Sequence, residues 1–226
     1  MILNNADNIM VGSRQVSSVY AGSQLVWNKG GLPSGYTKVL YLRSTGTQAI
    51  DTGYTPNDSS GFELKLRKYD NGDTIQLGCC TGTGGRWASN FAGNQPNIAW
   101  NTITYVGDSG YTLDTPYIAR LNYRNNRMSQ VFNADGSVFG EVDISSQGTL
   151  ATQSYTALLF AGHWKSSSIG LPSNCAIYYA QITEGNNIVR NFIPCLDPNN
   201  TPCMYDTVTA QAYYNIGTGD FSYESF

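Results

Sequence analysis

Charged residues are scarce in this chain, and no segment concentrates them. Lys, Arg, Asp and Glu together make up 13% of the 226 residues, whereas an average soluble domain has about 25%. The net charge is -3, and no strand-like or loop-like segment carries a cluster of Lys and Arg. A basic surface that could follow a phosphate backbone is therefore missing, and we expect no nucleic acid partner.

Long apolar runs are also missing. No apolar stretch approaches the ~18 residues that a membrane-spanning helix needs. The first residues, M-I-L-N-N-A-D, lack the basic start and the apolar run of a secretory signal. We therefore expect no membrane insertion, and we expect the protein to be made and folded in a cytoplasm.

The cysteines lack the spacing of a disulfide framework or a zinc site. There are five of them, which is an odd number, with one vicinal pair and no C-x-x-C motif. The sequence favours buried free thiols. The alternative is a bridge between Cys195 and Cys203 across the intervening loop at 197–202. The five are Cys79, Cys80, Cys175, Cys195 and Cys203.

Helical periodicity is absent, and strand patterns take its place. In residues 61–68 the apolar side chains of Phe62, Leu64 and Leu66 alternate with charged ones, as in a strand with one buried face. Turn-forming pairs such as Asp135 and Gly136 separate several such runs. The pattern predicts an all-β protein built as an antiparallel sandwich. Further strands are expected at 74–78, 97–106, 117–123, 127–133, 138–144, 156–161, 175–183 and 188–194.

The first 29 residues form a separate unit. Three short apolar runs are divided by Gly12-Ser13 and Gly22-Ser23, which predicts a small β-meander too short to bury a core alone. Residues 30–35 contain Gly-Gly and Pro-Ser-Gly and are expected to be a linker. The main domain is expected to span residues 36–226.

The two ends of the main domain carry long motifs. Near its start stands S-T-G-T-Q-A-I-D-T-G, and near its end stand R-N-F-I-P, M-Y-D and N-I-G-T-G. With these motifs the domain resembles the laminin-G-like, concanavalin A-like jelly-roll modules that recur in bacteriophage virion proteins and gut-bacterial surface proteins. The resemblance covers about residues 36–220 and implies a jelly-roll sandwich; it specifies a fold better than a function.

The amino-terminal unit is similar to the short β units of phage tail and other virion proteins. The apolar and aromatic positions that match this pattern include Val16, Val19, Tyr20, Val26 and Trp27. The resemblance implies an anchor or oligomerisation element covered by a neighbouring chain. The alternative is that these side chains pack on the main domain of the same chain.

Together the two resemblances imply a non-enzymatic bacteriophage virion accessory protein: a fibre, baseplate or capsid-surface decoration. It would be synthesised in the bacterial host cytoplasm, reside on the virion surface as a homo-oligomer, and bind other virion proteins or a host cell-surface glycan. A bacterial surface adhesin and a glycoside hydrolase or depolymerase on the same fold are the alternatives.

Two segments combine tryptophan with small polar residues, as a glycan site requires. Residues 83–90 contain Arg86, Trp87 and Asn90, and residues 163–168 contain Trp164 and Lys165. Both are expected to be loops and are the candidate ligand-binding segments. The alternative is that the two tryptophans close the ends of the core.

Catalytic patterns are incomplete. Glycoside hydrolases of the concanavalin A-like fold carry E-x-D-x-x-E or E-x-D-x-E on one strand, and this chain has Glu141 and Asp143 followed by serines where the last Glu would stand. Without the proton donor we expect a solvated strand and no enzyme. His163 has no nucleophile motif around it.

Two loops carry oxygen ligands that calcium could use. They are D-N-G-D at 70–73 and D-P-N-N at 197–200. The first is also an ordinary hairpin turn with Asn71 and Gly72 at its centre. We expect no cofactor and no metal site, with calcium as the alternative.

Overall fold

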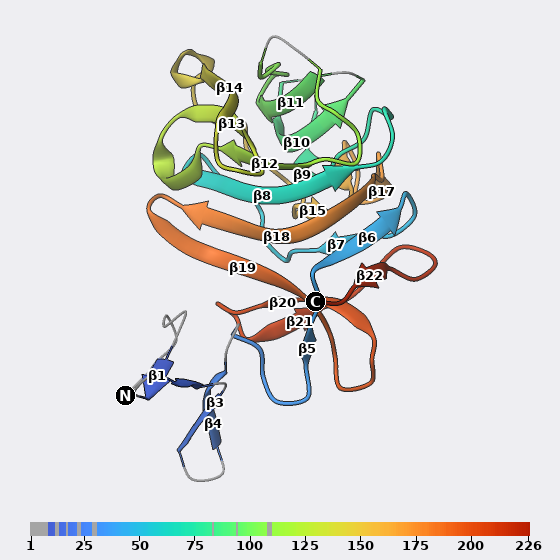
Figure 1. Ribbon diagram of the computed structural model, residues 1–226. Coiled ribbons are helices and arrows are strands. Elements are labelled where there is room, and N and C mark those ends of the chain that lie inside the picture. The colour runs from blue at the N-terminus through green and yellow to red at the C-terminus, as the bar shows by residue number, and fades with distance from the viewer. Residues whose placement is uncertain are drawn as a thin grey trace.

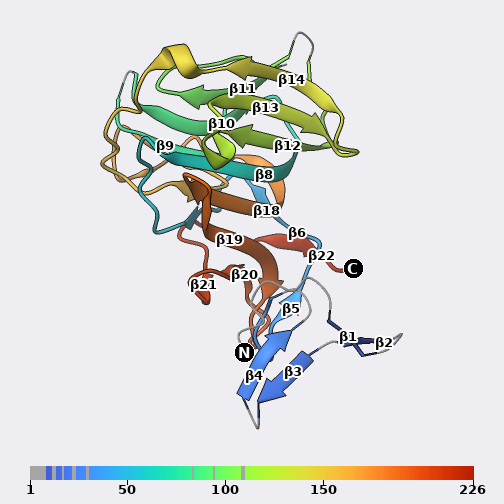
Figure 2. The same ribbon diagram turned by 90° about the vertical axis from the view of Figure 1, so that its left-hand side faces the viewer.

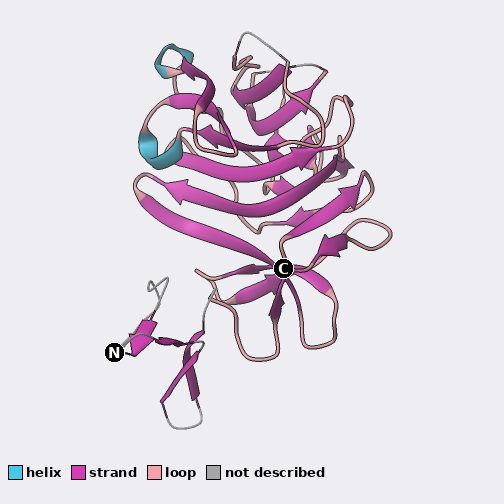
Figure 3. Ribbon diagram, viewed as in Figure 1, coloured by secondary structure: helices cyan, strands magenta, loops and turns pink. Residues whose placement is uncertain are grey.

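The computed structural model describes residues 9–11, 14–16, 18–21, 24–28, 31–82, 84–93, 95–107 and 110–226. Within them the fold is two layers of mostly antiparallel strands (Figures 1 and 3). This confirms the predicted all-β antiparallel sandwich. The helical segments in the described chain are two 3-10 turns, η1 (Tyr123–Asn125) and η2 (Ser145–Gln147), and no described helix is long and apolar enough to cross a membrane.

The larger layer has its longest strands side by side at its centre (Figure 2): β8 (Ser60–Lys68), β18 (Asn174–Glu184) and β19 (Asn187–Leu196). Beyond β8 follow β12 (Pro116–Leu121), β13 (Met128–Asn133) and β14 (Val138–Asp143). Beyond β19 follow β20 (Pro202–Asp206) and β21 (Gln211–Tyr213). The terminal strands of the domain join this layer as β5 (Thr37–Lys38), β6 (Tyr41–Thr45) and β22 (Ser222–Glu224).

The smaller layer has the order β11-β10-β9-β15-β7. Its strands are β7 (Ile50–Asp51), β9 (Leu77–Cys80), β10 (Arg86–Ala92), β11 (Gln95–Trp100) and β15 (Leu158–Leu159). A short pair, β16 (Gly162–Trp164) and β17 (Ile169–Gly170), extends it through a parallel contact of β16 with β9. Among the described strands, this pairing is parallel and the others are antiparallel.

The core lies between the two layers. On β8 the side chains of Phe62, Leu64 and Leu66 are fully buried, as their alternation predicts. Phe62 meets Trp87 of the smaller layer edge to face, with ring centres 5.0 Å apart. Because side chains alternate along a strand, the intervening residues of each strand face outward.

The amino-terminal unit forms two hairpins, β1 (Ile9–Val11) with β2 (Arg14–Val16) and β3 (Ser18–Ala21) with β4 (Gln24–Asn28). The predicted anchor residues Val16, Val19, Tyr20, Val26 and Trp27 lie on these strands. Their side chains fall outside the described part, so their role as an anchor stays a prediction.

Strand positions are predicted best in the larger layer. The strands expected at 61–68, 117–123, 127–133, 138–144, 175–183 and 188–194 match β8, β12, β13, β14, β18 and β19 closely. In the smaller layer the expected strand at 74–78 lies at β9, a few residues later, and β10 stands where a loop was predicted. All five cysteines are buried free thiols.

Candidate functional site

The motif near the start of the domain forms hydrogen bonds with the closing segment of the same chain. The Gln48 side chain accepts a hydrogen bond from the Thr45 backbone N–H (2.8 Å) and donates one to the carbonyl oxygen of Asp220 (3.1 Å). It is 2% exposed, so both ends of its amide are committed to the protein. Gln48 therefore links the first motif to the last and is not a ligand group.

The closing motif N-I-G-T-G completes the same link. The Asn215 side-chain oxygen accepts hydrogen bonds from the N–H groups of Ala49 (3.1 Å) and Gly217 (2.9 Å). The Ile216 N–H donates to the carbonyl of Ala49 (2.8 Å). We call this junction of residues 44–53 with residues 215–220 the terminal clasp.

A buried ion pair joins the other two motifs, R-N-F-I-P and M-Y-D. Asp206 is fully buried, and its carboxylate lies 3.6 Å from Nε of Arg190. The same carboxylate accepts hydrogen bonds from the N–H of Asn191 (2.8 Å) and of Val208 (3.0 Å). Arg190 also donates to the carbonyl of Thr52 (3.2 Å). The residues that carry the family resemblance are thus structural.

Two of the predicted glycan-binding residues do not reach the surface. Trp87 is fully buried and belongs to the core, so its selection as a glycan contact was wrong. Asn90 is 9% exposed, and its side-chain amide donates to Asp73 Oδ1 (2.9 Å). The reason is that residues 86–92 form the buried strand β10, not a loop.

The other three come together on the outer face of the smaller layer. Cys80 pairs with Arg86 across to β10 and with Trp164 across to β16, so these two side chains flank it on one face. The Arg86 guanidinium lies 4.8 Å from the Trp164 ring centre, and Lys165 Nζ lies 5.8 Å from it. We call Arg86, Trp164 and Lys165 the tryptophan cluster. Trp164 is half-buried and Lys165 is exposed.

A shallow depression adjoins this cluster. It is lined by Gly84, Arg86, Asn101, Thr102 and Ile103. Arg86 belongs to both, so a ligand on Trp164 can extend into the depression. Ile103 is 41% exposed and offers an apolar edge there.

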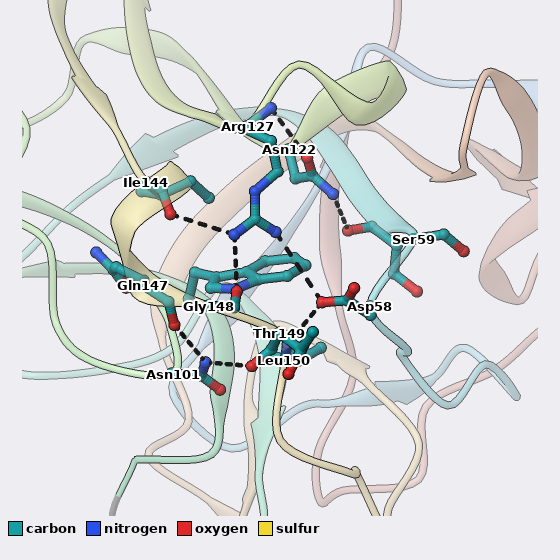
Figure 4. A network of polar contacts seen from close by, with 12 residues as sticks. Asp58, Ser59, Asn101, Asn122, Arg127, Ile144, Gln147, Gly148, Thr149 and Leu150 are labelled. Atoms are coloured by element: carbon teal, nitrogen blue, oxygen red, sulfur yellow. Dashed lines mark hydrogen bonds and ion pairs between the residues drawn. The ribbon is translucent and has the colours of Figure 1, made fainter.

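A polar network holds Asn101, one of the residues that line the depression (Figure 4). The Asn101 side chain donates to the carbonyls of Gln147 (3.1 Å) and Thr149 (2.7 Å) and accepts from the Ala151 N–H (2.8 Å). Arg127, just before β13, donates to the carbonyls of Ile144 (3.2 Å) and Gly148 (2.7 Å). The loop at 144–151 is therefore held in place, and its hydrogen bonds fix the position of Asn101 in the depression.

The Cys79 thiol, on the strand next to Trp164, is not an activated nucleophile. Burial, and to a lesser extent the neighbouring Cys80 thiol, raises the pKa of Cys79 well above its usual range, which keeps it protonated. Its Sγ contacts Gln153 Oε1 at 3.4 Å. His163, one strand away, uses Nδ1 for a hydrogen bond with the carbonyl of Thr156 (2.9 Å). The two side chains are thus engaged elsewhere and form no nucleophile and base pair.

The carboxylates predicted from the hydrolase pattern are exposed on the edge strand β14. Glu141 accepts a hydrogen bond from Gln130 (3.0 Å). Asp143 caps the following turn, where hydrogen bonds from the side chain and backbone of Ser145 lower its pKa. A lowered pKa is the opposite of what a general acid needs. This agrees with the expectation of a solvated strand.

The two candidate calcium loops use their oxygens internally. Asp70 accepts from the Gly72 N–H (3.0 Å) and pairs with the buried Lys68. Asp197 accepts from the N–H groups of Asn199 and Thr201, both at 2.8 Å, and these bonds lower its pKa. In the described part of the chain, no three His, Cys, Asp or Glu side chains converge in the manner of a metal site.

Comparisons with known proteins support the fold and leave the family open. No family model matches the chain, and no curated protein matches it in sequence. Among solved structures, it is similar to a "putative carbohydrate binding protein" from Bacteroides ovatus with a TM-score of 0.56 and 10% identity. The match covers 84% of this chain and 60% of the Bacteroides chain.

A more distant likeness, to a structure of NanB with optactamide, has a TM-score of 0.45 and 7% identity over 84% of this chain and 39% of NanB. This likeness is too distant to support an argument. The chain thus spans less than two thirds of the length of both structures. At 10% identity the Bacteroides match establishes a shared β-sandwich fold.

Proposed function

We propose that this chain is a non-enzymatic carbohydrate-binding module and that the tryptophan cluster is its glycan site. The observation that carries the proposal is the Trp164 ring with Arg86 4.8 Å from its centre and Lys165 beside it. A half-exposed aromatic ring can stack on the C–H face of a sugar, and the two basic groups can donate to its hydroxyls. The fold likeness to a protein described as carbohydrate-binding supports the same assignment.

The proposed setting is a bacteriophage virion. The motifs at both ends of the sandwich and the amino-terminal β unit support it, because both resemble parts of virion proteins. In this setting the protein is a fibre, baseplate or capsid-surface component that displays the sandwich toward a host glycan or another virion protein. Several copies on one particle would turn weak single contacts into firm adhesion.

The test is glycan binding with a matched aromatic control. Full-length protein is applied to a glycan array and to intact gut bacteria, beside the variants Trp164→Ala and Tyr223→Ala. Tyr223 is 44% exposed on β22, far from the cluster in the sequence and on the other layer. We expect saturable binding, weakened at least about tenfold by Trp164→Ala and unchanged by Tyr223→Ala, since a central aromatic contact is worth ~2 kcal/mol.

Two results would contradict the proposal. One is undiminished binding by Trp164→Ala protein that melts like the original. The other is no binding by any variant, which would favour a purely structural role in the particle. Glu141→Gln is included as an enzyme control, and we expect it to change neither binding nor any release of reducing sugar.

A further inference from the structure

The outer face of the larger layer carries a second group of basic and aromatic side chains. Lys65 and Arg67 alternate with core residues of β8 and so point outward. Ala176 of β18 pairs with Arg67 on one side and with Arg43 of β6 on the other. The two arginines therefore stand in one row across three strands, with a small side chain between them.

Tyrosine rings hold these basic groups in place. The Arg43 guanidinium lies 3.8 Å from the centre of the Tyr69 ring. Arg67 lies 5.6 Å from the ring centres of both Tyr41 and Tyr178, and Lys65 Nζ lies 5.3 Å from that of Tyr178. Such contacts orient a cation without neutralising it. We call this set the arginine–tyrosine face: Tyr41, Arg43, Lys65, Arg67, Tyr69 and Tyr178.

The donors on this face are under-used. Nε of Arg43 and Nε of Arg67 are both shielded from solvent without a hydrogen-bond partner in the described part of the chain. Leaving a buried donor unpaired destabilises the fold. The side-chain oxygen of Asn174, two residues before Ala176 on β18, and the hydroxyl of Tyr178 are unpaired as well. Four unsatisfied polar atoms thus gather in one region.

The nearby carboxylates compensate the positive charge of Arg43, Lys65 and Arg67 only in part. Asp114 approaches Arg67 at 3.4 Å but is 68% exposed. Glu224 accepts the hydroxyl hydrogen of Tyr41 (2.7 Å), and Glu63 is bound by Arg120 and Tyr179. Among the described residues, Arg43 has no ion pair. The whole chain has a net charge of -3, so a local excess of basic groups distinguishes this face and favours anionic ligands.

We infer that the arginine–tyrosine face is a binding site for a carboxylated saccharide, such as a chain of uronic acids. Planar guanidinium groups bind carboxylates through two parallel hydrogen bonds, and tyrosine rings suit the faces and hydroxyls of sugar rings. An acidic peptide can also bind an arginine cluster, but it fits less well here, because it has no sugar ring for the tyrosines to stack on and no free strand edge to pair with. Here β18 and β8 are paired on both sides.

This site is separate from the tryptophan cluster. The cluster lies on the outer face of the smaller layer, and the arginine–tyrosine face lies on the outer face of the larger one, with the core between them. The inference therefore does not rest on the proposed glycan site at Trp164. The side chains of either surface can therefore be substituted without changing those of the other.

The test compares a saccharide with its own uncharged ester. Titration calorimetry with the full-length protein uses tetragalacturonic acid and its methyl ester, in which each carboxylate is replaced by an uncharged ester of the same sugar chain. We expect the acid to bind at least about tenfold more tightly, since hydrogen bonds to a charged carboxylate are roughly twice as strong as those to a neutral ester. Binding should also weaken as the salt concentration rises.

Variants locate the binding. Arg43→Gln and Lys65→Gln should each weaken binding of the acid, and Arg43→Lys should restore only part of it because the planar fork is lost. Arg124→Gln, which changes an exposed arginine on η1, should have no effect, and Trp164→Ala is measured beside it to detect any acid bound at the tryptophan cluster.

Three results would overturn the inference: equal binding of acid and ester, wild-type binding by both Arg43→Gln and Lys65→Gln, or equally tight binding of tetraglutamate. The last would indicate an acidic protein partner. If Arg43→Gln fails to fold, Lys65→Gln and the ester comparison decide the matter. Loss of binding in Trp164→Ala alone would assign the acid to the tryptophan cluster instead.

Discussion

At the scale of single residues, Arg190 is the side chain whose loss should cost most outside the core. It offsets the buried charge of Asp206 at 3.6 Å while remaining 19% exposed itself. Removing one partner of a buried pair costs about 3–5 kcal/mol. Because water can partly reach this site, we expect Arg190→Met to lower the free energy of unfolding by about 2–4 kcal/mol.

Urea unfolding measures this cost. Arg124→Met serves as the control, because Arg124 is exposed and its substitution should change stability by no more than about 0.5 kcal/mol. Equal stabilities for the two variants would mean that Asp206 is satisfied by its hydrogen bonds from Asn191, Val208 and Thr209.

Single residues also show how far the sequence predicts the candidate sites. Trp87 and Trp164 follow a basic or polar residue in similar local sequences, yet one is in the core and the other is half-buried. Whether a tryptophan faces the core depends on its place in the alternation of side chains along the strand. Residues 83–90 show no alternation of apolar and polar residues that would predict it. The arginine–tyrosine face was missed because its members lie far apart in the chain and meet only through strand pairing.

At the scale of elements, the terminal clasp depends on a close backbone approach at Gly217. A Cβ added there would overlap the carbonyl oxygen of Thr47, which is backbone and cannot rotate away. We therefore expect Gly217→Ala to push residues 44–53 and 215–220 apart and to destabilise the fold by about 2–3 kcal/mol. Thermal unfolding is the measurement.

Gly82→Ala is the matched control for that substitution. A Cβ at Gly82 meets nothing within 4 Å, so stability should stay within about 0.5 kcal/mol. A normal melting temperature for Gly217→Ala would show that the clasp can open slightly without loss.

Elements also explain which strands were predictable. β8 shows a buried face and a wet face, so its period of two is visible in the sequence. β10 has five successive buried residues, with glycines before it and a polar Ser-Asn pair inside it. A strand covered on both faces loses its alternation and cannot be distinguished from a loop with aromatic residues.

At the scale of the whole molecule, the sandwich is expected to fold without the amino-terminal unit. The described core clusters draw only on residues from Leu32 onward. We expect a protein that starts at Gly31 to melt at the same temperature as the full chain. If residues 1–29 are an oligomerisation element, the full chain should be an oligomer and the truncated one a monomer.

Light scattering after size-exclusion chromatography separates these outcomes. A truncated protein that keeps the oligomeric state of the full chain would contradict the anchor role. So would a truncated protein that still enters virus particles.

The pairing of β6 with β22 also sets how the sandwich responds to mechanical force. Glu224 lies opposite Tyr41, and Ser222 lies opposite Arg43, so the chain enters β6 beside the point where it leaves β22, after the short pairing of β5 with β19. A pull that separates those two points would break the hydrogen bonds between β6 and β22 one at a time, as a zipper opens. A force applied between residue 31 and the tryptophan cluster puts no load on β22. The domain should therefore withstand more tension when it is tethered by its amino-terminal end alone than when it is tethered by both ends.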